Sequence, residues 1–189
     1  GITEIENSLF KEALDKVKFY LKSGTRPHIV YASNPEKNFS VPADETLYEA
    51  YRNADILLPD GIGMVWAARI IHGKRFSRVP GSEFIFDICK LAAQEGQGIF
   101  LYGAGEDVNE GAARILAERY PGLQIAGRAN GYIKDDEMDD LVRRINQSGA
   151  SVLFIALGSP KQEKWVASYK DSLTHVRVCQ CVGGTLDTI

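Results

Sequence analysis

The sequence is poor in several features that mark whole classes of protein. It has three cysteines and three histidines in 189 residues, and the histidines are isolated, so neither a disulfide framework nor a metal site is predicted. No apolar run approaches the roughly 18 residues that a membrane span needs, and the first residues lack a signal-peptide pattern. An odd number of cysteines is typical of free thiols in a reducing cytoplasm.

An excess of positive charge is also missing. Lys and Arg number 22 against 25 Asp and Glu, which gives a net charge of −3. A chain with this balance offers no electrostatic case for nucleic acid as its main partner. Hydrophobic residues make up 44% and charged residues 25%, as in an ordinary soluble globular domain.

Apolar runs alternate with helical patterns along the whole chain. This alternation predicts an α/β fold: one Rossmann-like domain over residues 1–189, with a doubly wound, mostly parallel sheet covered by helices on both faces. The six apolar runs are 28–33, 55–60, 98–104, 123–128, 151–158 and 176–183. The seven helical patterns are 6–22, 44–53, 62–72, 82–95, 108–120, 135–148 and 161–172.

Small and polar residues follow five of these predicted strands. Ligands of open α/β sheets bind outside the carboxyl ends of the strands, so a site assembled from several loops is expected there. The residues at these ends are Asn34-Pro35-Glu36, Asp60-Gly61, Gly103-Ala104-Gly105, Gly158-Ser159-Pro160 and Gly183-Gly184-Thr185.

Asp60 stands at the end of an apolar run and before a helical pattern. It can cap that helix, but Gly61 and Gly63 lie in the first turn, where each weakens a helix by about 1 kcal/mol relative to Ala. Glycine at such positions indicates that something approaches the backbone closely. Asp60 is therefore a candidate base, or else a group that holds a hydroxyl or a cation.

The segment LGSPKQEKW, residues 157–165, allows two interpretations. Ser159, Pro160 and Gln162 fit the N-cap, N1 and N3 positions of a capping box. Lys161 does not fit, because a cation in the first turn opposes the helix dipole. A bound anion would reverse that effect, so a phosphate-bearing ligand is expected at this helix N-terminus.

Two further segments bear on nucleotide binding. LYGAGEDVNEGAARI, residues 101–115, begins like a dinucleotide fingerprint, but Val108 occupies the third glycine position and Asp107 and Glu110 resemble a cap and a first-turn acid. Gly103 and Gly105 then leave room for a ribose or a base. Arg78, before Pro80-Gly81, could clamp a diphosphate with two parallel hydrogen bonds or could simply be solvated.

Taken together, these segments resemble the bacterial WecG/TagA/CpsF glycosyltransferase family across nearly the whole chain. The resemblance rests on six pieces in this order and spacing: the Asn-Pro-Glu of YASNPEKN, LLPDGIG, RVPG, LYGAG, ALGSPKQEKW and GGTLD. It implies an inverting enzyme that needs no metal or other cofactor. Such an enzyme moves N-acetylmannosamine or a related sugar from a UDP-sugar to an undecaprenyl-diphosphate-linked acceptor in teichoic acid or exopolysaccharide synthesis.

The resemblance also implies roles for individual residues. Asp60 matches the proposed catalytic base, Asn34 and Gln162 match positions that line the pocket, and Arg78 matches an arginine near the diphosphate. Gly158, Lys161 and Thr185, which are expected from their own places at strand ends and at a helix start, complete the substrate contacts. The chain departs from the family at Ala32, where many members carry Thr.

Members usually continue past GGTLD with a basic amphipathic segment, so a membrane-docking piece is expected to be missing here. The resemblance implies a cytoplasmic protein, peripheral to the inner face of the membrane through that segment, and it leaves a homo-oligomer open. Two alternatives stand beside it: a nicotinamide-dependent oxidoreductase, in which Arg128 would accept a 2′-phosphate, and a non-catalytic module that binds UDP-sugars.

Overall fold

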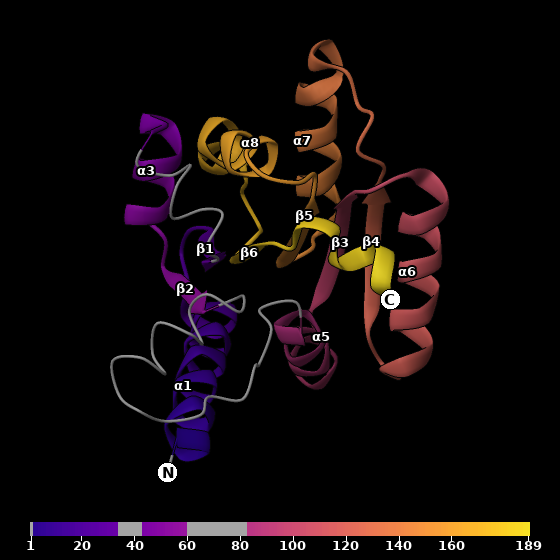
Figure 1. The fold of residues 1–189 in the computed structure, drawn as a ribbon. Coiled ribbons are helices and arrows are strands. Elements are labelled where there is room, and N and C mark those ends of the chain that lie inside the picture. Colours follow the sequence, from indigo (N-terminus) through magenta and orange to yellow (C-terminus); the bar gives the residue numbers. More distant parts are fainter. Residues whose placement is uncertain (1, 34–42, 60–82) are drawn as a thin grey trace.

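The computed structural model describes residues 2–33, 43–59 and 83–189 (Figure 1). It contains one six-stranded sheet in the order β2-β1-β6-β5-β3-β4, and every neighbouring pair is parallel. The predicted α/β fold is therefore confirmed. The strands are β1 (His28–Ser33), β2 (Ile56–Pro59), β3 (Gly98–Gly103), β4 (Gln124–Ala129), β5 (Val152–Ala156) and β6 (Val178–Cys181).

Helices connect the strands close to the predicted places. The α-helices are α1 (Ile2–Ser23), α3 (Glu45–Arg52), α5 (Phe84–Gln94), α6 (Glu106–Arg119), α7 (Met138–Ser148) and α8 (Lys161–Tyr169). Short 3₁₀ helices are η2 (Asp135–Glu137), η3 (Lys170–Ser172) and η4 (Gly183–Thr188). The helix expected over 62–72 lies outside the described residues.

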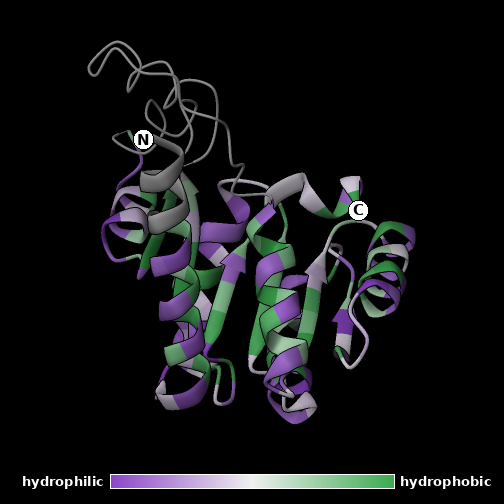
Figure 2. Ribbon diagram, turned by 90° about the horizontal axis from the view of Figure 1, so that it is seen from below, coloured by the Kyte–Doolittle hydropathy of each residue, from purple (hydrophilic) through white to green (hydrophobic). Residues whose placement is uncertain are grey.

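The helices form two layers, one on each face of the sheet (Figure 1). Residues of α1, α5 and α6 share one hydrophobic cluster with the sheet, and residues of α7 and α8, with α3 beside them, share the other. Apolar residues follow the strands and the inner sides of the helices (Figure 2). Strand β5 is buried along its whole length, because it contributes to both clusters, as its continuous apolar run predicts.

The two cysteines of β6 lie on one face of the sheet. Cys179 and Cys181 are both buried in the cluster beneath α7 and α8, since alternate residues of a strand point to one face. Burial raises the pKa of the Cys179 thiol to about 12. Both residues act as small apolar groups of the core.

One carboxylate ties the starts of β1 and β2 together at the amino edge of the sheet. Asp55 accepts the Ile29 backbone N–H at 2.8 Å and two bonds from the Arg26 guanidinium, at 3.1 and 2.6 Å. His28 Nδ1 lies 3.4 Å from the same carboxylate, and its ring stacks on Tyr20. Burial, together with the Arg26 charge, lowers the pKa of His28. His28 thus has a partner carboxylate 27 positions away in the chain, and the pair belongs to the fold.

The order in which strands are added across the sheet changes direction between β3 and β5. β3 leads through α6 to β4 on one side of the sheet, whereas β5 leads through α8 to β6 on the other, and β3 and β5 are hydrogen-bonded neighbours. A crevice forms where the connections of adjacent strands diverge in this way, and it is where ligands of such sheets bind. The switch point lies at the carboxyl ends of β3 and β5.

Candidate active site

Three loops meet at this switch point around one backbone segment. Ala104 donates its N–H to Ala156 O at 2.8 Å, and its own carbonyl accepts the Gly131 N–H at 2.8 Å. The loops that follow β3, β4 and β5 are therefore joined through Ala104. Ala104 itself has φ of 55°, a left-handed conformation that costs a residue with a side chain of order 1 kcal/mol or more.

Gly103 is required at the end of β3 for two reasons. Its φ is 115°, a region that residues with a Cβ rarely enter. A Cβ placed there would stand 2.6 Å from the carbonyl carbon of Ala156 and would overlap its oxygen. Gly105, by contrast, is the N-cap of α6, and a Cβ there would meet open space. The first glycine therefore allows β3 and β5 to approach, and the second leaves the start of α6 uncovered.

A buried asparagine fixes the same turn from beneath. Asn109 is fully buried, and its Nδ2 donates to Gly103 O at 2.9 Å, Ala129 O at 3.0 Å and Leu101 O at 3.3 Å. These carbonyls lie in the second half of β3 and at the end of β4. No sequence pattern indicates this role, because an asparagine near a helix start is ordinarily a cap or a surface residue.

Helix α8 begins at the switch point without a capping side chain. Pro160 occupies the N-cap position and no side-chain cap bond is present, so the capping box of Ser159, Pro160 and Gln162 is wrong. Lys161 is the first helical residue, exposed, with Nζ 3.4 Å from Gly131 O. Gln162 is 2% exposed, and its Oε1 accepts the Gly183 N–H at 3.1 Å. Gln162 thus connects the start of α8 with the turn after β6.

Glu163 is a residue that the sequence did not reveal. It lies in the first turn of α8 with no exposed surface, and its Oε1 accepts the Tyr51 hydroxyl at 2.9 Å. An acidic residue in a first turn is usually explained by the helix dipole and by solvent. The burial arises because α3 packs against α8, a long-range contact that no local pattern announces.

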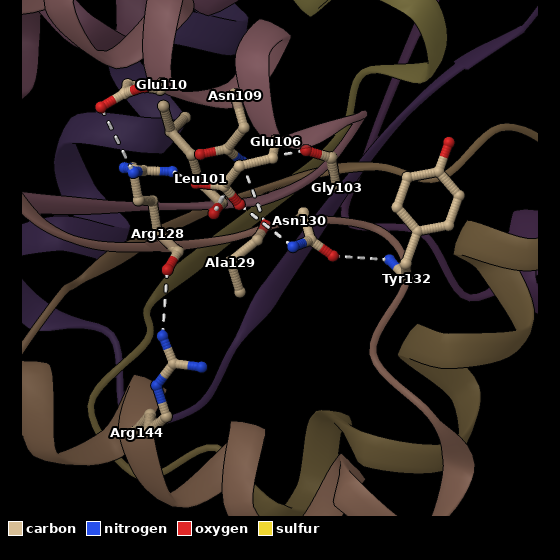
Figure 3. A network of polar contacts seen from close by, with 10 residues as sticks. All are labelled: Leu101, Gly103, Glu106, Asn109, Glu110, Arg128, Ala129, Asn130, Tyr132 and Arg144. Atoms are coloured by element: carbon tan, nitrogen blue, oxygen red, sulfur yellow. Dashed lines mark hydrogen bonds and ion pairs between the residues drawn. The ribbon is translucent and has the colours of Figure 1, made fainter.

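An acidic network surrounds the start of α6 (Figure 3). Glu106 accepts bonds from the Arg128 guanidinium and, at 3.0 Å, from Asn130 Nδ2, and Arg128 also lies 3.7 Å from Glu110. Asn130 Oδ1 in turn accepts the Tyr132 N–H at 2.9 Å. Helix α6 starts at Glu106 after an N-cap glycine, so the reading of Asp107 as the cap is wrong.

This network weighs against the nicotinamide alternative. A 2′-phosphate would need the Arg128 guanidinium, and that group already faces two carboxylates. The hydrogen bonds from Arg128 and Asn130 lower the pKa of Glu106, so its negative charge persists at neutral pH and repels phosphate. Tyr132, which is 80% exposed, extends from the loop that follows β4. No sequence pattern assigns a role to this residue.

The remaining predicted residues divide into two groups. Gly158 follows β5 with φ of 76°, and Thr185 lies in η4, where its hydroxyl donates to Val182 O at 2.6 Å. The structure therefore brings residues after β3, β5 and β6 to one edge of the sheet. Five predicted residues lie outside the described part of the chain: Asn34, Asp60, Gly61, Gly63 and Arg78.

The described residues contain neither a cluster of metal ligands nor a membrane span. Within residues 2–33, 43–59 and 83–189, no group of three or more His, Cys, Asp or Glu is placed to hold a metal ion. Over the same residues, none of the helices combines the length and the apolar character that crossing a bilayer requires.

Comparison with known proteins decides the family. The profile described as "Glycosyl transferase WecG/TagA/CpsF family" matches residues 2–189. The chain belongs to the WecG/TagA/CpsF family. The resemblance carried by the sequence motifs is thereby confirmed.

Two WecG/TagA/CpsF relatives have the same curated name, N-acetylglucosaminyldiphosphoundecaprenol N-acetyl-beta-D-mannosaminyltransferase. The protein of Bacillus subtilis strain 168 is 31% identical over 159 residues, which are 84% of this chain and 61% of the relative. The protein of Staphylococcus aureus strain MRSA252 is 29% identical over 185 residues, or 97% of this chain and 72% of the relative. The chain thus spans about three fifths of the length of the first relative and under three quarters of the second.

Proposed function

We propose that the chain is the core of an inverting glycosyltransferase that uses a UDP-sugar. The transferred sugar is N-acetylmannosamine or a close relative, and the acceptor is N-acetylglucosamine linked through a diphosphate to undecaprenol. The names of the two relatives support the sugar and the acceptor. The product belongs to the synthesis of teichoic acid or another cell-surface polysaccharide.

The start of α8 is the observation that carries the proposal. Its first backbone N–H groups have no capping side chain, and an exposed lysine stands on its first residue. The helix dipole makes such a terminus a site for anions. Its place at the switch point between β3 and β5 is where a sheet of this type binds nucleotides. Gly158 precedes it, and a Cβ at that position would meet open space, so the approach to this terminus is uncovered there.

A glycosyl transfer needs two kinds of assistance, and the proposal assigns residues to each. The departing UDP gains negative charge, which Lys161, the α8 N-terminus and Arg78 would stabilise in place of a divalent cation. The acceptor hydroxyl must lose its proton as it attacks the anomeric carbon. Asp60 would take that proton, with Gly61 and Gly63 leaving space beside it and Asn34 lining the pocket.

The acidic network at α6 supports one orientation of the donor. Because Glu106 would repel phosphate, the diphosphate is expected at α8 and the uridine toward the loops after β3 and β4. Gly105 leaves the start of α6 open on that side, and the exposed ring of Tyr132 offers a face on which a base can stack. The donor would then lie along the carboxyl edge.

The proposal extends to the setting of the reaction. The acceptor is a membrane lipid, so the protein would work in the cytoplasm at the inner face of the membrane. A non-catalytic module that only binds UDP-sugars would share the nucleotide site but would transfer no sugar. An assay of the lipid product separates these two possibilities.

Lys161→Ala tests the proposed diphosphate site. Loss of this cation is expected to weaken UDP binding about tenfold, which corresponds to about 1.4 kcal/mol, because one charge-assisted contact disappears while the helix N–H groups remain. Isothermal titration with UDP, in buffer that contains EDTA, measures the change. Weaker salt dependence of binding in the variant is also expected.

Lys164→Ala is the matched control. Lys164 is another exposed lysine of α8, one turn further along, and it pairs with Asp44 at 3.5 Å. Its removal should leave UDP affinity within about twofold. Equal losses in both variants, or no loss in Lys161→Ala, would remove the diphosphate from the start of α8.

A further inference from the structure

Buried polar groups form a chain that runs beneath the candidate site. The Tyr51 hydroxyl donates to Glu163 Oε1 at 2.9 Å, Gln162 Nε2 lies 3.5 Å from that same oxygen, and Gln162 Oε1 accepts the Gly183 N–H at 3.1 Å. We infer that Glu163 and Tyr51 are positioning residues for sugar transfer, acting through Gln162 on the turn after β6. This inference rests on the proposed function.

The burial of the Glu163 carboxylate is energetically unfavourable. Its side chain has no exposed surface, and a carboxylate taken fully out of water costs several kcal/mol unless hydrogen bonds compensate it. A helix first turn can be built from many residues that carry no such cost. A buried carboxylate at this position, next to the exposed lysine of the proposed diphosphate site, therefore indicates a specific task.

The Tyr51 hydroxyl is a lasting hydrogen-bond donor to the Glu163 carboxylate. Burial, reinforced by the neighbouring Glu163 charge and hydrogen bond, raises the pKa of Tyr51. The phenol accordingly stays protonated and donates throughout the physiological range. Its ring stacks on Tyr31 of β1 with centroids 4.9 Å apart, so the hydroxyl is held from the sheet as well as from α3.

The carboxylate also fixes the orientation of the neighbouring amide. A side-chain amide has a donor end and an acceptor end. With Nε2 of Gln162 directed at Glu163 Oε1, its Oε1 is left facing the Gly183 N–H. An amide at position 163 would weaken this preference, because it can present its NH2 group as well as its oxygen to Gln162, and a rotated Gln162 amide would present N–H groups to the Gly183 N–H.

The hydrogen bonds from Tyr51 to Gly183 join segments that follow three different strands. Tyr51 lies in α3 after β1, Gln162 and Glu163 begin α8 after β5, and Gly183 follows β6. Gly183 has φ of 56°, a left-handed backbone conformation, and its N–H donates to Gln162 Oε1. The polar chain thus sets where the start of α8 lies relative to the loops beside it at the carboxyl edge.

Glu163→Gln in the protein at its natural length tests the inference. We expect kcat, calculated per protein molecule that binds UDP, to fall about 10- to 100-fold. A misplacement of reacting groups by about 1 Å has effects of this size. UDP stoichiometry from calorimetry and the dissociation constant for UDP should stay within about threefold, because Lys161 and the α8 N-terminus remain. Tyr51→Phe, which deletes one oxygen, should give a smaller loss of kcat in the same direction. The double variant should lose less than the product of the two single losses.

Lys164→Ala is the control, because the exposed Lys164–Asp44 pair also joins α8 to α3. It should keep kcat within about twofold of wild type. The inference is overturned if Tyr51→Phe and Glu163→Gln retain wild-type kcat, or if UDP stoichiometry falls in step with kcat, which marks a purely structural role. If the wild-type protein neither binds UDP nor transfers sugar, the proposed function fails, and the inference fails with it.

Discussion

Asp60→Asn is expected to lower kcat for sugar transfer by about 10²- to 10⁴-fold, the usual contribution of a general base. The carboxamide cannot accept the proton of the acceptor hydroxyl, although it has nearly the same shape. UDP affinity should stay within about twofold, because the groups proposed to hold the diphosphate belong to other segments. The assay follows labelled sugar from the UDP-sugar into the lipid fraction, with the protein at its natural length.

The strand order places a condition on this assignment. Asp60 follows Pro59, the last residue of β2, and β1 and β6 lie between β2 and β5. Three strand spacings of about 4.8 Å separate β2 from the start of α8 across the sheet. The donor must therefore extend from α8 toward β1, so that its sugar and the acceptor meet near the end of β2.

Asp15→Asn is a suitable control for Asp60→Asn. Asp15 is an exposed acid on α1, and its change should leave transfer unaffected. If Asp60→Asn retained more than about a tenth of wild-type kcat, the base assignment would be wrong. If it abolished UDP binding as well, Asp60 would belong to the nucleotide site instead.

Gly103→Ala is expected to destabilise the fold by about 3 kcal/mol or more, which is large for a single methyl group. The new Cβ would enter a left-handed backbone conformation, which alone costs of order 1–3 kcal/mol. It would also overlap the Ala156 carbonyl where β3 meets β5. For a domain of this size the loss corresponds to a decrease in Tm of about 6–12 °C, measurable by calorimetry or circular dichroism.

Gly111→Ala provides a comparison of opposite sign. Gly111 lies inside α6, and a Cβ there would meet nothing within 4 Å. Alanine in a helix interior is favoured over glycine by about 1 kcal/mol, so this variant should unfold at a higher temperature than wild type. A Gly103→Ala protein as stable as Gly111→Ala would show that the β3–β5 approach is not as close as described.

The sequence was sufficient to predict most of the fold. Strands β3 and β5 were recognisable because they are buried on both faces and are therefore almost continuously apolar. Helix limits were predicted less well: α6 begins at Glu106, where a glycine N-cap replaces the expected acidic cap. The position of β6 between β1 and β5 depends on packing between distant segments, and no local pattern encodes it.

The candidate site was predicted in outline and with errors of detail. Glycine and small polar residues marked the carboxyl ends correctly, because close backbone approach leaves few alternatives to glycine. Gln162 fitted a capping pattern, yet its amide bonds to Gly183, twenty-one positions away. Glu163 was overlooked because its burial depends on α3, and Tyr51 lies 112 residues earlier in the chain.

Transfer of sugar to the lipid acceptor tests the central claim most directly. The protein at its natural length is incubated in EDTA with UDP-N-acetylmannosamine and undecaprenyl-diphosphate-linked N-acetylglucosamine, and the lipid is examined by mass spectrometry. The account predicts a lipid heavier by one N-acetylhexosamine, with one UDP released for each product formed. UDP binding without any lipid product, or release of free sugar in place of transfer, would contradict it.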